Sequence, residues 1–153
     1  MYGVKCIEEM LELLKYNDKQ HESILRDYYS RKDLDRYTNK GIYCVLSLLG
    51  IYHSDFYVLS DNGTVVGCIL VRTKLSKACK RESWIYDVFI LQDYRGKGYG
   101  KEMMLMAFEK CKYPTVYLNV LKDNNLAINM YKRLGMREIG TTDEEIIMRY
   151  DKV

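Results

Sequence analysis

The residues best suited to chemistry lie in one short segment that combines glycines with basic side chains. It reads Arg95-Gly96-Lys97-Gly98-Tyr99-Gly100-Lys101. Consecutive backbone N–H groups can grip a phosphate only where no Cβ blocks the approach, and the first turn of a helix has unpaired N–H groups to offer. Arg95, Lys97 and Lys101 add positive charge at the same point. The segment therefore predicts an anion site for a pyrophosphate group.

The elements on either side of this segment must hold it in place. Residues 84–91 are mostly β-branched, aromatic and apolar and predict a strand, whereas residues 101–110 are strong helix formers. Two common nucleotide-binding patterns do not fit this strand-turn-helix unit. The Gly-Lys-Ser/Thr of a P-loop is absent, and a dinucleotide fingerprint would follow an early strand, with an acidic residue about 20 positions later.

A second motif follows the first at a fixed distance. Residues 95–100 resemble the Gln/Arg-x-x-Gly-x-Gly/Ala signature of the GCN5-related N-acetyltransferase (GNAT) family. Residues 124–136 resemble the Asn-x-x-Ala-x-x-x-Tyr-x-x-x-Gly-Phe/Met element of the same family. With the preceding strand and the C-terminal hairpin, the resemblance covers roughly residues 56–152. Two ordered motifs at the family's spacing make it specific.

The resemblance implies an α/β fold in one N-acetyltransferase domain over residues 1–153. We expect a mixed, splayed sheet of six or seven strands with helices on both faces, and the length of 153 residues suits a single core. In open sheets, ligands bind where neighbouring parallel strands point their C-terminal ends apart. Here those ends are expected near Leu91 and Val120.

By the same resemblance, the co-substrate is acetyl-CoA. Its pantetheine arm is expected along the backbone of residues 88–90, and its pyrophosphate on the N–H groups of residues 96–101. Asn124 matches the position that holds the pantetheine arm, although a helix N-cap would use the same residue. The implied cofactor-binding residues are Val88, Phe89, Ile90, Arg95, Gly96, Lys97, Gly98, Tyr99, Gly100, Lys101 and Asn124.

The implied reaction is acetyl transfer to a primary amine of a small molecule or peptide. A neutral amine must attack the thioester carbonyl, and the departing thiolate must be protonated. The N–H of Ile90 is the candidate for polarising the carbonyl. Tyr131 matches the family's general acid, although a tyrosine packed on a helix face would look the same. Since neither motif contains a cysteine to carry the acyl group, we expect direct transfer in a ternary complex.

The general base is left open by the sequence. An alkyl amine with a pKa near 10 is mostly protonated at pH 7, so a base must take its proton. In the branch of the family that acetylates protein N-termini, a glutamate often stands where this chain has Asn119. The alternatives are water or one of Glu82, Asp87, Asp123 and His53.

Composition limits the other functions. The net charge is only +3, and basic residues alternate with acidic ones, so no nucleic-acid partner is expected. Five widely spaced cysteines and two histidines give no metal-site spacing. No apolar run reaches the roughly 18 to 20 residues of a membrane span, and no secretory signal is present, which predicts a cytoplasmic protein without membrane partners.

The remaining segments are assigned by pattern. Apolar spacing at Ile7, Met10, Leu11 and Leu14 predicts one helix, and the spacing at Ile24, Leu25 and Tyr28 predicts another. The run 42–49 is apolar but of uncertain type. Strands at 56–59 and 64–71 flank a turn at Asp61-Asn62-Gly63, and the charged residues 72–83 read as a solvated loop. After the helix at 101–110, we expect a strand at 115–120, a helix at 126–134 and a hairpin of residues 137–140 and 146–150.

Three alternatives remain open. A non-catalytic acyl-CoA-binding or sensor protein would keep the cleft without acceptor chemistry, and a transferase of longer acyl groups would share the fold. A plain nucleotide-binding protein fits least, because the P-loop context is missing. Acceptor identity is not readable, and a homodimer is compatible with the resemblance, since dimers are common in the family.

Overall fold

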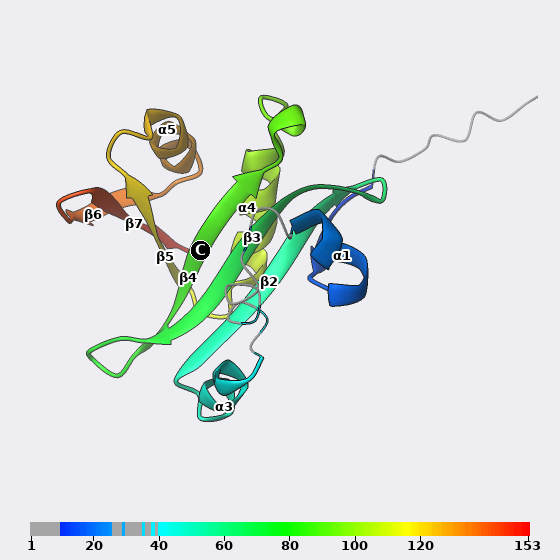
Figure 1. The fold of residues 1–153 in the computed structure, drawn as a ribbon. Coiled ribbons are helices and arrows are strands. Elements are labelled where there is room, and N and C mark those ends of the chain that lie inside the picture. The colour runs from blue at the N-terminus through cyan, green and yellow to red at the C-terminus, as the bar shows by residue number, and fades with distance from the viewer. Residues whose placement is uncertain (1–9, 26–28, 30–34, 36–37, 39) are drawn as a thin grey trace, which may run out of the picture.

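The computed structural model describes residues 10–25, 29, 35, 38 and 40–153. Within these residues, seven strands form one sheet in the order β1-β2-β3-β4-β5-β7-β6 (Figure 1). The strands are β1 Leu11–Lys15, β2 Tyr52–Asp61, β3 Thr64–Leu75, β4 Arg81–Ile90, β5 Thr115–Leu121, β6 Arg137–Thr141 and β7 Glu145–Asp151. The helices are α1 Asp18–Leu25, α3 Ile42–Leu48, α4 Tyr99–Lys110 and α5 Asn125–Arg133, with a short 3-10 helix, η1 Gln92–Tyr94.

The sheet is mixed, as predicted. Neighbouring strands pair antiparallel except β4 and β5, which run parallel and are connected through α4. The turn between β2 and β3 also lies where it was predicted. Asn62 and Gly63 have φ angles of 47° and 85°, the left-handed values that a two-residue hairpin turn requires.

Helices cover both faces of the sheet. Side chains alternate in direction along each strand, so apolar residues of the central strands point to both faces and need a covering layer on each. Figure 1 shows α1 and α4 on opposite sides. One buried cluster joins Leu25 of α1 to Phe56, Val58 and Leu70. The other joins α4 and α5 to the opposite face of the sheet. Its members include Leu59, Ile69, Ile85, Met103, Met104, Ala107, Phe108, Ile128 and Tyr131.

The helix predicted around Met10, Leu11 and Leu14 is wrong within the described residues. Leu11–Lys15 is strand β1, paired antiparallel with β2. A short apolar run fits either element, and here the edge of β2 supplies partners for its backbone groups. Ile7 and Tyr28 lie outside the described residues. The helix predicted at residues 24–25 is confirmed by α1, and the uncertain run at 42–49 is helix α3.

The solvated loop predicted at residues 72–83 is also largely wrong. β3 continues to Leu75 and β4 begins at Arg81, which leaves only residues 76–80 as a turn. Arg72 is buried, with its guanidinium carbon 4.6 Å from the ring centres of Tyr52 and Tyr86. These two aromatic rings, on the neighbouring strands β2 and β4, attract the Arg72 guanidinium. This charged residue can therefore lie within β3.

The C-terminal elements agree with the predictions. β5 leads into α5, which is followed by Gly135 in the left-handed conformation, with φ 92°. β6 and β7 pair antiparallel, and β7 inserts between β6 and β5. This insertion places the start of β7 beside the C-terminal end of β5, because Glu145 pairs with Leu121.

Candidate active site

The two parallel strands of the sheet separate partway along their length. β4 and β5 pair with each other only over residues 83–85 and 116–118, and beyond these residues each continues beside its other neighbour alone. A cleft of about 290 Å³ opens between them. It is lined by Ile85, Tyr86, Asp87, Val88, Leu118, Asn119, Val120, Leu121, Asn124, Tyr131 and Glu145. The splay predicted near the ends of these strands therefore exists in the structure.

A β-bulge on β4 accompanies the splay. Cys68 pairs with Phe89 but Leu70 pairs with Tyr86, so β4 holds one extra residue between these pairs. Asp87 lies in this interval with φ 51°, a left-handed value that aspartate tolerates better than most residues. Bulges bend a strand and increase its local twist. An aspartate inside an otherwise apolar strand was the only sequence signal of this bend.

The bulge is followed by the segment expected to meet the pantetheine arm. The N–H of Leu91 donates to Val66 O at 2.8 Å, and Phe89 pairs with Cys68, so both residues direct their backbone groups towards β3. Because these directions alternate along a strand, Ile90 directs its N–H and C=O away from β3. Its carbonyl accepts a hydrogen bond from Arg95 Nε at 2.8 Å. Ile90 thus offers its backbone N–H on the open side of β4, and Val88 lines the cleft.

The glycine segment forms a turn between η1 and α4. Gly96 and Gly98 have φ angles of 76° and 87°, and no atom lies within 4 Å of the position that a Cβ would take at either residue. Gly98 is the N-cap of α4, so the unpaired N–H groups of the first turn follow directly. Lys97 and Lys101 are exposed beside them. This open, basic backbone cradle fits a pyrophosphate.

Two contacts tie this turn to the rest of the domain. The Tyr99 hydroxyl donates to Asp61 at the β2–β3 hairpin. Gly100 lies against α5, because a Cβ there would be 3.3 Å from Met130 Sδ. The two sequence motifs are therefore in contact in the folded chain.

Tyr131 and Asn124 reach the cleft from α5. Tyr131 is only 6% exposed, and burial raises its pKa to about 12. Within the described part of the chain, its hydroxyl has no hydrogen-bonding partner, so it remains available to a ligand. Asn124 caps α5 by accepting from Ala127 N at 3.3 Å, and it also lines the cleft. Both readings of Asn124, cap and cleft residue, are compatible with this geometry.

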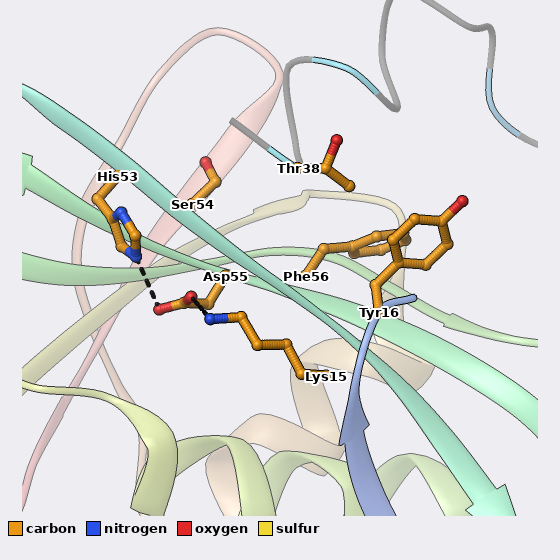
Figure 2. A pocket seen from close by; sticks show the side chains of 7 residues that line it. All are labelled: Lys15, Tyr16, Thr38, His53, Ser54, Asp55 and Phe56. Carbon is orange, nitrogen blue, oxygen red and sulfur yellow. Dashed lines mark ion pairs between the residues drawn. The ribbon is translucent and has the colours of Figure 1, made fainter. Parts of the chain in front are cut away.

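Of the four side chains considered as general bases, Asp87 lines the cleft. Glu82 accepts a hydrogen bond from Trp84 Nε1 at 3.2 Å near the start of β4. Asp123 is exposed in the turn before α5. His53 lies on β2 beside a separate small pocket of about 130 Å³, where it contacts Asp55 at 3.2 Å and Asp55 pairs with Lys15 (Figure 2).

The structure adds a carboxylate that the sequence interpretation missed. Glu145, the first residue of β7, lines the cleft, and its Oε2 accepts a hydrogen bond from Asn119 Nδ2 at 2.9 Å. Asn119 lies on β5, where the resemblance drew attention to a missing glutamate. The proximity depends on the pairing of β5 with β7, for which the sequence carries no local signal.

Metal and membrane features are not found among the described residues. No group of three or more histidine, cysteine, aspartate or glutamate side chains is arranged to hold a metal ion there. No helix in that part of the chain is long and apolar enough to cross a membrane.

Comparison with known proteins gives consistent matches. The model of the acetyltransferase (GNAT) family matches residues 13–136. An N-alpha-acetyltransferase of Sulfurisphaera tokodaii is 29% identical over 112 residues, which cover 66% of this chain and 67% of that protein. A spermine/spermidine N(1)-acetyltransferase of Bacillus subtilis is 36% identical over 66 residues, which cover 39% of this chain and 42% of that protein. The chain thus spans about two thirds of one curated relative and less than half of the other.

A solved structure shows the same fold. Arabidopsis thaliana NAA60, crystallised with acetyl-CoA, superposes with a TM-score of 0.68 at 18% identity, covering 93% of this chain and 98% of that one. This likeness confirms the predicted splayed sheet with helices on both faces. The family model covers most of the sequence, including both motifs at residues 95–100 and 124–136. The chain belongs to the acetyltransferase (GNAT) family.

Proposed function

We propose that this protein transfers the acetyl group of acetyl-CoA to a primary amine of a small molecule or peptide. The observation that carries the proposal is the cleft between β4 and β5, which brings Tyr131 and Asn124 together where the two strands separate. β4 leads from this cleft into the glycine turn. The Tyr131 hydroxyl, the Ile90 N–H and the backbone of the glycine turn could therefore contact one extended ligand.

The chain's own residues fit the parts of the co-substrate. The glycine turn and the first turn of α4 would hold the pyrophosphate through backbone N–H groups, aided by Lys97 and Lys101. The backbone of residues 88–90 and the side chain of Asn124 would hold the pantetheine arm. Bound acetyl-CoA supplies an activated acyl group as a thioester.

Tyr131 acts as the general acid in this proposal. Its raised pKa of about 12 keeps the phenol protonated throughout the neutral range, so it can donate a proton to the departing sulfur. The N–H of Ile90 polarises the thioester carbonyl. The amine nitrogen first loses its extra proton to water or to a carboxylate at the cleft, and then forms the new bond to the carbonyl carbon as the carbon–sulfur bond breaks. The nitrogen loses a second proton as the amide forms, and a proton from solvent restores the phenol of Tyr131.

Direct transfer is supported by the pKa values and the positions of the cysteines in the described residues. Burial raises the pKa of Cys68 to about 12 and that of Cys111 to about 11. Thiols with such a pKa form little thiolate near pH 7 and are poor nucleophiles. Cys44 and Cys79 are exposed and do not line the cleft. A ternary complex of acetyl-CoA, amine and protein therefore fits better than an acyl-cysteine intermediate.

The first experiment measures acetyl-CoA binding by calorimetry and then thiol release over a panel of amines. The panel holds a polyamine, an aminoglycoside, amino acids and short peptides with a free N-terminus. Micromolar binding and amine-dependent thiol release are expected. Absence of acetyl-CoA binding would refute the proposal, and binding without turnover on any amine would favour the non-catalytic acyl-CoA-binding alternative.

A further inference from the structure

The cleft is lined by two carboxylates from different strands. Asp87 comes from the bulge of β4, and Glu145 comes from the start of β7. No ion pair with a lysine or arginine is found for either one among the described residues. The nearby cations are engaged elsewhere, since Lys122 Nζ donates to Asp143 O at 3.1 Å and Arg149 pairs with Asp151 at 2.7 Å.

Glu145 is held more firmly than a surface glutamate. Its side chain accepts the hydrogen bond from Asn119, and its backbone N–H donates to Thr142 Oγ1 at 3.0 Å. Its position on β7 is set by the pairing with Leu121. A neutral amide orients this carboxylate without neutralising it, so the cleft keeps a negative charge at a defined place.

The same cleft also contains a hydrogen-bond donor that is available to a ligand. Tyr131 is 6% exposed and lines the cleft, and its hydroxyl has no hydrogen-bonding partner within the described residues. A phenol at the wall of a cleft, without a partner in the protein, can donate a hydrogen bond to a ligand there. The cleft therefore combines an unsatisfied proton donor with carboxylates that lack a cation.

We propose that Glu145, oriented by Asn119, binds the positively charged ammonium group of the acceptor and so selects cationic amines as substrates. The inference rests on the proposed function and adds its acceptor-binding residue. An alkyl amine enters the cleft as an ammonium ion at neutral pH, and a carboxylate that lacks a cation provides a charge-assisted hydrogen bond to it. Asn119 is a positioning residue, because it acts through Glu145.

The test compares Glu145→Gln with Glu144→Gln. Glu144 is the exposed neighbour outside the cleft lining, so its variant is the matched control. With spermidine and with a short peptide as acceptors, Glu145→Gln is expected to lower kcat/KM at least about tenfold, mainly through KM. Acetyl-CoA affinity should change less than about twofold in both variants. Equal kcat/KM in Glu145→Gln and wild type, or an equal loss of acetyl-CoA affinity, would overturn the inference.

Calorimetry of the same amines on the CoA-loaded protein gives a readout that needs no turnover. Weaker amine binding by Glu145→Gln supports the inference even if thiol release fails and the proposed function falls. Equal binding by both proteins, or no amine binding by the wild type, overturns it. Asn119→Ala is expected to raise KM in the wild-type background and to have no further effect in Glu145→Gln. Additive effects of the two substitutions would contradict the positioning role.

Discussion

Replacing Tyr131 by phenylalanine removes the hydroxyl oxygen at the cleft and leaves the packed ring in place. The residue is 6% exposed, and its ring belongs to the core that joins α4, α5 and the sheet. Because the hydroxyl has no partner within the described residues, its removal breaks no hydrogen bond of the protein. We therefore expect the free energy of unfolding of the variant to lie within about 1 kcal/mol of the wild-type value, the net worth of one typical hydrogen bond.

The expected loss of activity follows from the role of the proton. The rise in the pKa of Tyr131 from 10 to about 12 means that ionisation costs about 2 to 3 kcal/mol more in the folded protein than in water. The phenol thus keeps its proton until the sulfur takes it. General acid catalysis contributes about 10²- to 10⁴-fold, so kcat should fall by a factor in that range.

The assay is thiol release at saturating acetyl-CoA and amine, combined with acetyl-CoA calorimetry and thermal unfolding. Tyr150→Phe is the matched control, because Tyr150 stacks on Phe108 at 4.1 Å and lies outside the cleft lining. Tyr131→Phe should bind acetyl-CoA within about threefold of the wild type, and Tyr150→Phe should keep wild-type kcat. Less than about a threefold loss of kcat in Tyr131→Phe would refute the acid role. A lower melting temperature would show that the hydroxyl has a structural partner.

Three further predictions concern the glycines and pH. Gly98 and Gly63 have nearly equal φ angles, 87° and 85°, so Gly98→Glu and Gly63→Glu should each lower the free energy of unfolding by about 1 to 2 kcal/mol. Only Gly98→Glu should abolish acetyl-CoA binding, measured by calorimetry. Gly67→Ala should destabilise the protein in urea titrations and weaken acetyl-CoA binding, because the new Cβ would lie 2.5 Å from Phe89 O. In the control Gly140→Ala, the Cβ would lie 3.7 Å from Ile147 Cδ1, and neither effect is expected. Burial raises the pKa of four acids, so these groups ionise at lower pH in the unfolded chain than in the folded one. The free energy of unfolding should therefore fall as the pH rises from about 9 to 12. Constant urea midpoints up to pH 11 would contradict this. These acids are Cys68, Tyr57 and Tyr131, each with a pKa raised to about 12, and Cys111, raised to about 11.

Sequence patterns predicted the elements whose conformation depends on neighbouring residues. The β2–β3 turn follows from Asn62 and Gly63, which accept positive φ, and α5 follows from the cap at Asn124 and the glycine after its end. The strand-turn-helix unit of residues 84–110 was predicted for the same reason. In these segments, local backbone preference and tertiary packing favour the same conformation.

The N-terminal strand and the charged part of β3 were missed because packing overrode local pattern. Residues 11–15 form a strand only because the edge of β2 is available to them. Arg72 tolerates burial because two tyrosine rings from neighbouring strands stack against it. Neither partner is near in sequence, so no window of a few residues contains the information.

The sequence by itself determined the family, the glycine turn and the presence of Tyr131 in the second motif. These features depend on residue type and spacing, which are visible without coordinates. Only the tertiary structure placed Glu145 beside Asn119 and brought Asp87 into the same cleft. Strand pairing sets these distances across 26 residues of chain, and a shift of one residue in register would turn Glu145 to the other face of the sheet.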